Sequence, residues 1–276
     1  MDAVCTLTAI LFSASNLIRI GLRITNKSYF NFELWKELDI DYIQNGWDTL
    51  YNRRFFGLVG GLLNAAAWFT LCVPVIEVAW ILSKGGKRKL GVHTLMGTLA
   101  IGGGVAEILS HLMMVGLENV AGRMSKDFNL DDWVNFNDGT GWRVLEMTTM
   151  ESYGLVLWVD AFEWLALFGV LLTIFTSART EKEPSFGKHW ANFGVFIAVL
   201  CLVDFLANIA IFDERGLFMI ITIVISIANT LIFIPVWLLF LARQLPLASP
   251  NYLYHEPQDA PTEMATEEVA PVATIS

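Results

Sequence analysis

The stretch "TTMESYGLVLWVDAFEWLALFGVL", Thr148 to Leu171, has the length and apolar character of a membrane-spanning helix. It nevertheless contains three carboxylates, Glu151, Asp160 and Glu163. A single charged residue at the bilayer centre costs at least ~2.5–3.5 kcal/mol on insertion scales. Such residues normally face the interior of a helix bundle or a water-filled cavity. The stretch therefore indicates a helical membrane protein with a polar interior.

The composition of the whole chain supports this interpretation. Of its 276 residues, 55% are hydrophobic and only 16% are charged, and the mean hydropathy is +0.53. A soluble domain of this length carries more charge. The net charge of −9 is not that of a nucleic-acid-binding protein, so we expect no nucleic acid as partner. The three cysteines are scattered, which favours neither a disulfide framework nor a zinc site.

Five segments exceed the ~20 residues that a helix needs to cross a hydrocarbon core of ~30 Å. They are 56–82, 95–117, 151–175, 190–212 and 217–241. We therefore predict an all-α membrane protein, a five-transmembrane-helix bundle at 56–244. Residues 1–55 form an N-terminal segment with an interfacial or anchoring helix at 3–22, for which a signal peptide and a sixth span are the alternatives. Residues 245–276, rich in Pro, Ala and Glu, form a disordered acidic tail.

Basic residues in two connections predict the orientation in the membrane. The connection at 83–91 holds four basic residues and no acidic one, and the connection at 177–189 holds Arg179, Lys182 and Lys188. Connections enriched in Lys and Arg face the cytoplasm. With five spans, this predicts a cytoplasmic C-terminus and a lumenal N-terminus.

Polar residues in the spans form sets at helical spacing. Glu107 and His111 are four residues apart and share a helix face, and so do Asp204 and Asn208. Glu151 shares a face with Trp158, seven residues on. A carboxyl group in apolar surroundings can hold a proton at neutral pH. Two such groups on opposite sides of a flat apolar ligand would donate a proton to one carbon and remove one from another.

Other polar residues of the spans have simpler roles. Asp160 and Glu163 lie off the face of Glu151, so we expect them to join helices by hydrogen bonds or to approach the cytoplasmic surface. Pro235 should kink the last span and free a backbone carbonyl near Asn229.

A metal site is the other chemical interpretation of these residues. Glu107, His111, Glu151 and Asp160 would supply a carboxylate-rich set of ligands. The sequence lacks the paired Glu-x-x-His motifs and the several histidines that such sites favour. We therefore expect neither a metal ion nor a cofactor.

The stretch "MESYGLVLWVDAFEW", residues 150–164, resembles the emopamil-binding protein family, the sterol Δ8–Δ7 isomerases of the EXPERA group. That family has a Met-Glu pair, a Leu-Trp seven residues later and a further Trp, matched here by Met150-Glu151, Leu157-Trp158 and Trp164. Three other stretches resemble it as well. They are "AWILSKGG" at 79–86, "LVDFLANIAIFDE" at 202–214 and "IANTLIFIPVWLLFLA" at 227–242. The resemblance covers roughly residues 56–244.

The resemblance implies functions for individual residues. Glu107 and Glu151 correspond to the family's membrane glutamates and would be the catalytic acid and base, and His111 would relay or orient the proton. The substrate-binding residues would be Asn229, Trp158 and Asp204. The family's histidine one turn before the second-span glutamate is replaced here by Gly103, and its tryptophan one turn after the asparagine is replaced by Ile232.

These observations are compatible with three functions. The first is a sterol isomerase of the endoplasmic reticulum membrane that shifts a ring double bond by protonation and deprotonation. The second is a non-catalytic protein that binds a sterol or another apolar small molecule and regulates lipid metabolism. The third is a proton-coupled transporter or channel, in which the carboxylates form a relay. The expected partners are the apolar ligand and membrane lipid, and a homodimer is left open.

Overall fold

The computed structural model describes residues 2–24, 40–84, 90–127, 140–180, 186–210 and 215–248. Within these ranges the chain is helical and contains no β-strand, which confirms the predicted all-α class. Of the predicted disordered tail at 245–276, residues 245–248 belong to the last helix, and the rest lies outside the described residues.

The described residues form eight successive helical elements. They are α1 (Asp2–Ile24), α2 (Ile40–Leu82), α3 (Leu90–Asp127), α5 (Thr140–Thr180), α6 (Lys188–Ala210), α7 (Arg215–Ala228), the π-helix η2 (Asn229–Phe233) and α8 (Ile234–Ala248). The last three are continuous and form one long rod. The π-helix ends at Phe233, two residues before Pro235, whose missing backbone N–H interrupts the α-helical hydrogen bonds.

Six helical stretches are long and apolar enough to cross a membrane. They are Asp2–Gly21, Arg54–Leu82, Leu90–Leu117, Gly154–Thr180, Lys188–Ala210 and Gly216–Ala248. The first lies in α1, which the sequence analysis treated as an interfacial or anchoring helix. Thr8 Oγ1 donates to Thr70 Oγ1 at 3.0 Å and Ser15 Oγ donates to the Gly60 carbonyl at 2.9 Å, so α1 packs along α2. α1 therefore packs in the bundle together with the five predicted spans, which agrees with the sixth-span alternative.

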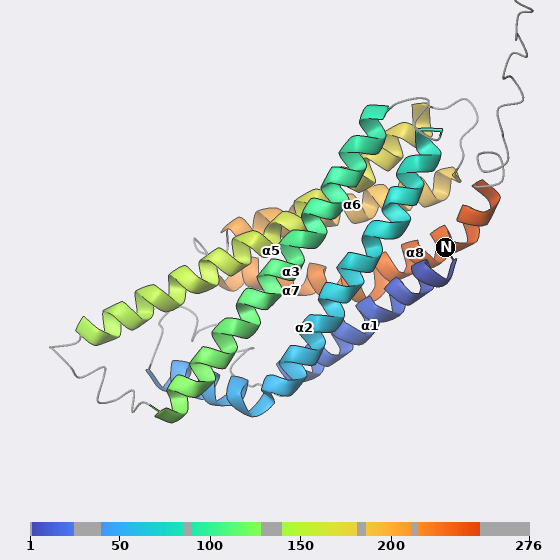
Figure 1. Cartoon of the computed structure of the whole chain (residues 1–276). Coiled ribbons are helices and arrows are strands. Elements are labelled where there is room, and N and C mark those ends of the chain that lie inside the picture. Colours follow the sequence, from blue (N-terminus) through green and yellow to red (C-terminus); the bar gives the residue numbers. More distant parts are fainter. Residues whose placement is uncertain are drawn as a thin grey trace, which may run out of the picture.

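The helices contact one another in a closed sequence (Figure 1). Each helix contacts the next in the order α1, α2, α3, α5, α6 and the rod of α7, η2 and α8. The circle is closed by contacts between α8 and α1. Large apolar side chains such as Phe69, Leu112 and Phe196 are exposed. Lipid can cover such surfaces, because its tails are as apolar as these side chains.

Both ends of the described chain lie at one end of the bundle. Thr8 pairs with Thr70 and Ser15 with Gly60, so α1 and α2 are antiparallel. At the α5–α6 connection, the Gly187 N–H donates to Oε1 of Gln244 at 2.9 Å, near the end of α8. Figure 1 shows the N-terminus close to that end. The expected lumenal N-terminus and cytoplasmic C-terminus were derived for five spans, and this orientation stays a prediction.

Candidate functional site

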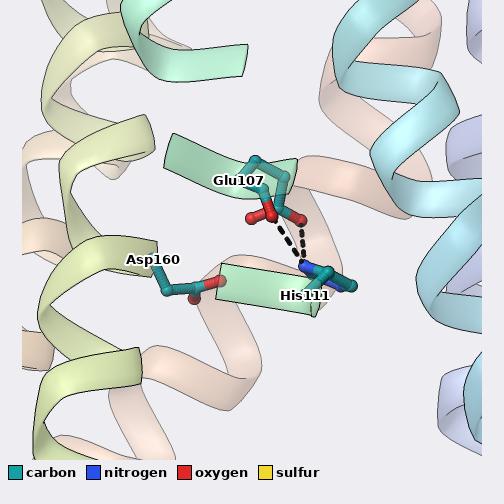
Figure 2. A group of neighbouring side chains, drawn as sticks. All are labelled: Glu107, His111 and Asp160. Atoms are coloured by element: carbon teal, nitrogen blue, oxygen red, sulfur yellow. Dashed lines mark hydrogen bonds and ion pairs between the residues drawn. The ribbon is translucent and has the colours of Figure 1, made fainter. Parts of the chain in front are cut away.

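Glu107 and His111 form the centre of a polar site on α3. They lie one turn apart with exposed fractions of 0% and 7%. His111 Nδ1 lies 2.9 Å from Oε1 of Glu107 and 3.2 Å from the Glu107 backbone carbonyl oxygen, and Figure 2 marks both interactions. Since both neighbours are hydrogen-bond acceptors, Nδ1 carries the hydrogen. The pair expected from the four-residue spacing is therefore formed.

Asp160 approaches this pair from α5 (Figure 2). The hydroxyl group of Ser110 lies 3.1 Å from Oδ1 of Asp160 and 3.3 Å from Oε2 of Glu107. A hydroxyl group can donate one hydrogen bond and accept others. Ser110 therefore connects the carboxyl groups of two helices.

Two more buried side chains complete the site. Glu163, one turn after Asp160, is 3% exposed and interacts with the carboxyl group of Glu107. Asn64 of α2 donates from Nδ2 to Oε1 of Glu107 and lies 3.4 Å from Nε2 of His111. We call this set the acid–histidine cluster; its members are Asn64, Glu107, Ser110, His111, Asp160 and Glu163.

Glycines bring these helices close enough for the cluster to form. A Cβ atom at Gly103 of α3 would lie 2.9 Å from Cβ of Ala166 on α5, and one at Gly61 of α2 would lie 3.2 Å from Cδ2 of His111. Small residues at such positions allow close helix packing in membranes. The glycines therefore position α3 between its two polar neighbours. A histidine at position 103, as in the family that the sequence resembles, would require α3 and α5 to move apart.

The charges of the cluster determine its chemistry. It contains three carboxyl groups and one imidazole, and Arg19 of α1 is the nearby cation whose charge acts on all three acids. Carboxyl groups in contact inside an apolar environment do not all ionise together, and they share protons instead. The cluster is therefore suited to hold and release a proton within the membrane.

A metal ion is the other cation that this donor set could hold. Glu107, His111 and Asp160 each offer a ligand atom, and these atoms lie within 4.8 Å of one another. Two carboxylate oxygens and an imidazole nitrogen suit a divalent ion such as Zn²⁺ or Mn²⁺. In the structure, however, the Nδ1 hydrogen lies between His111 and Glu107, and Ser110 links Glu107 to Asp160. The three possible metal ligands are thus hydrogen-bonded to one another or through Ser110, as in a proton-binding network.

The cavity beside the cluster is small. Its lining includes Trp68, Gly103 and Glu163, and its volume is about 10 Å³. That is room for one water molecule at most, whereas pockets for small-molecule ligands measure about 300–1,000 Å³. This cavity is therefore too small for a sterol-sized ligand.

The described contacts do not bring Glu151 into the acid–histidine cluster, so its partnership with Glu107 stays a prediction. Glu151 is exposed and precedes the apolar stretch of α5, which begins at Gly154. It lies nine residues before Asp160, about 13.5 Å along a helix at 1.5 Å per residue. Asp160 and Glu163, which the sequence analysis assigned to helix joining, are the acids of α5 that meet Glu107. Trp158 is 57% exposed and does not belong to the cluster either.

Asp204 and Asn229 belong to a second buried polar set. Both are fully buried, Asp204 on α6 and Asn229 at the start of η2. Asn208 Nδ2 donates to Oδ1 of Asp204 at 3.3 Å, and Asn229 Nδ2 donates to Sγ of Cys201 at 3.8 Å. We call this set the α6–η2 polar group; its members are Cys201, Asp204, Asn208, Thr222 and Asn229.

The sequence analysis missed Asn64 and Ser110. Both have signals in the sequence. Asn64 follows the pair Gly60-Gly61, and paired small residues mark places where membrane helices approach closely. Ser110 directly precedes His111 and lies one turn after Glu107. A search for polar residues within one turn of glycines would have found Asn64, and a search for polar residues within one turn of Glu107 would have found Ser110.

Comparison of this chain with family models, with curated proteins and with solved structures gave no match. The function is therefore inferred from the geometry of the site.

Proposed function

We propose that this chain performs acid–base chemistry inside the membrane and that the acid–histidine cluster is its proton-exchanging centre. The observation that carries the proposal is the hydrogen-bonded path from His111 through Glu107 and Ser110 to Asp160. It joins an imidazole to two carboxyl groups on adjacent helices. Ionisable residues at this depth are costly and usually serve function.

The path gives each group a defined role. His111 carries a hydrogen on Nδ1, while its Nε2 faces the amide of Asn64 and is free to accept a proton. Ser110 can accept a hydrogen from one carboxyl group while it donates its own to the other, which moves a proton between Glu107 and Asp160. When Nε2 is protonated, rotation of the Asn64 amide offers Oδ1, which has no partner in the structure, as its acceptor.

The reaction we propose first is the shift of a ring double bond in a sterol-like lipid. One acid protonates a carbon of the double bond, and a second removes a proton from a neighbouring carbon. Asp160 is the half-buried acid of the cluster and would meet the substrate, and Glu107 with His111 would return the proton. Because the cavity holds at most one water, α3 and α5 must separate to admit the substrate. Location in the endoplasmic reticulum membrane is part of this proposal.

The test is conversion of a Δ8 sterol by microsomes from isomerase-deficient cells that express the chain. We expect product with the wild type and a loss of about 10²–10⁴-fold in turnover with Glu107→Gln or Asp160→Asn. Glu151→Gln separates the two assignments: it retains turnover if Asp160 is the second acid, and it abolishes turnover if the resemblance assigns the role correctly. Absence of product, where an authentic isomerase is active, contradicts the isomerase proposal.

Gly103 favours the non-catalytic alternative. It replaces a histidine of the resembling family, and its packing against Ala166 excludes a side chain of that size without movement of the helix. Saturable binding of a radiolabelled cationic amphiphile without turnover would select a sterol-binding regulator.

The continuity of polar groups favours proton-coupled transport as a further candidate. Asp160 lies within range of the charge on Asp204, so polar side chains extend from α2 to α6 across the bundle. Proton flux into proteoliposomes that contain the purified chain, lost on Asp160→Asn, would establish this function.

A further inference from the structure

The α6–η2 polar group contains buried oxygen atoms that lack hydrogen-bond partners. Among the described residues these are Oδ2 of Asp204, Oδ1 of Asn208, Oδ1 of Asn229 and Oγ1 of Thr222. Asp204, Asn208 and Asn229 are at most 1% exposed. A buried polar atom without a partner costs about 1–3 kcal/mol, so four of them on neighbouring elements require an explanation.

Contacts place these residues close together. Asn208 bonds to Asp204 one turn away, and Thr222 of α7 lies beside the Asp204 carboxyl group. Asn229 bonds to Cys201, which lies one turn before Asp204 on the same face of α6. The residues that carry the unpaired atoms therefore come from α6, α7 and η2, and they contact Asp204 or the residue one turn before it.

The backbone at this place can supply further oxygen ligands. η2 separates α7 from α8, and Pro235 follows it without an N–H group. A proline in a helix leaves a carbonyl of the preceding turn without its partner. Interrupted helices inside membrane proteins use such carbonyls to coordinate cations.

The donor chemistry specifies the kind of ligand. All four unpaired atoms are oxygens, and three of them are neutral, so the set suits a hard cation. The only formal charge in the group is that of Asp204, and the other charge that acts on it is Asp160, also an acid. One carboxylate balances a monovalent cation in an apolar interior, whereas a divalent ion would remain uncompensated.

We infer that the α6–η2 polar group binds one sodium ion, with Asp204 as the charged ligand and Asn229, Asn208 and Thr222 as neutral ones. This site shares no residue with the acid–histidine cluster, so sodium binding can be tested independently of the proposed function.

The test is equilibrium binding of ²²Na⁺ to the purified full chain in lipid nanodiscs, in choline buffer. We expect saturable binding of about one ion per chain, competed by unlabelled sodium and not by choline. Asp204→Asn, which keeps the shape of the side chain, should abolish binding, and Asn229→Leu should weaken it at least tenfold. Asn16→Leu is the matched control, because it removes a buried amide of α1 that lies outside the site.

Size-exclusion chromatography of each variant establishes that it remains folded. Absence of saturable binding by the folded wild type overturns the inference and leaves a proton on Asp204 as the balancing cation. Unchanged binding by folded Asp204→Asn overturns it as well, because sodium would then bind elsewhere.

Discussion

The two buried polar sites of this protein differ in how their atoms are satisfied. In the acid–histidine cluster, Glu107 receives hydrogen bonds from three side chains, those of Asn64, Ser110 and His111. In the α6–η2 polar group, Asp204 receives one side-chain hydrogen bond, from Asn208, and its Oδ2 has none. Both acids are fully buried. The same sequence feature, an acid within a span, thus produces one carboxyl group with three side-chain donors and one with an unpaired oxygen.

This difference predicts opposite responses to apolar substitution. Removing one partner of a bonded network strands the others, whereas removing an unpaired acceptor removes a penalty. The variants below measure that contrast by unfolding in mixed micelles in sodium-free choline buffer.

His111→Leu should have the largest effect. It keeps an apolar side chain of similar size but leaves the buried Glu107 without the imidazole that donates to it. Loss of one partner of a buried pair costs about 3–5 kcal/mol. Glu151→Gln, at an exposed position of α5, should change the free energy of unfolding by less than about 0.5 kcal/mol. A small effect of His111→Leu would mean that the cluster is not bonded as described.

Gly103→Ala should have the next largest effect. The new methyl group would lie 2.9 Å from Cβ of Ala166, so α3 and α5 must move apart, and the Glu107–Ser110–Asp160 path must lengthen. Overpacking of this kind costs about 1–3 kcal/mol. Gly97→Ala is the matched control on the same helix, since a Cβ atom there meets nothing within 4 Å. Equal stability of the two variants would refute the close contact of α3 and α5.

Asn64→Leu should cost about 1–2 kcal/mol, because it removes the amide that donates to Glu107 and faces Nε2 of His111. Asn64→Asp tests the same contact differently. It keeps the shape and replaces the donor by an acid, and should therefore destabilise the protein more than Asn64→Leu does. Stability of Asn64→Asp equal to that of the wild type would contradict the assigned direction of the hydrogen bond.

Much of the fold was predictable because apolar length alone identifies spanning helices. The pair of Glu107 and His111 was also predictable, since its geometry depends only on the spacing within one helix. The inclusion of α1 was not, because its polar residues Ser15 and Thr8 suit an interfacial helix as well as a packed one.

The partner of Glu107 on α5 was not predictable from hydrophobic pattern. In a membrane, apolar side chains face both lipid and neighbouring helices, so the pattern does not show which side of α5 faces inward. Glu151 was preferred because it shares a helix face with Trp158 and because the resemblance favoured it, whereas Asp160 was assigned to joining helices. The contact of Gly103 with Ala166 sets the position of α5 on α3, and this contact brings Asp160 and Glu163 to the cluster.

Asn229→Leu should have the smallest effect and completes the comparison with Asn64→Leu. Both asparagines are buried on helices of the same bundle, and both substitutions remove one amide. Asn229 loses only a weak bond to the sulfur of Cys201, and its unpaired Oδ1 disappears with it. We expect the free energy of unfolding to change by less than about 0.5 kcal/mol without sodium, because the cost of the lost hydrogen bond is offset by removal of the unpaired oxygen. In sodium the variant should be less stable than the wild type, because only the wild type gains stability from a bound ion. A loss equal to that of Asn64→Leu in choline would show that the Asn229 amide is satisfied within the protein, and the distinction between the two sites would then be lost.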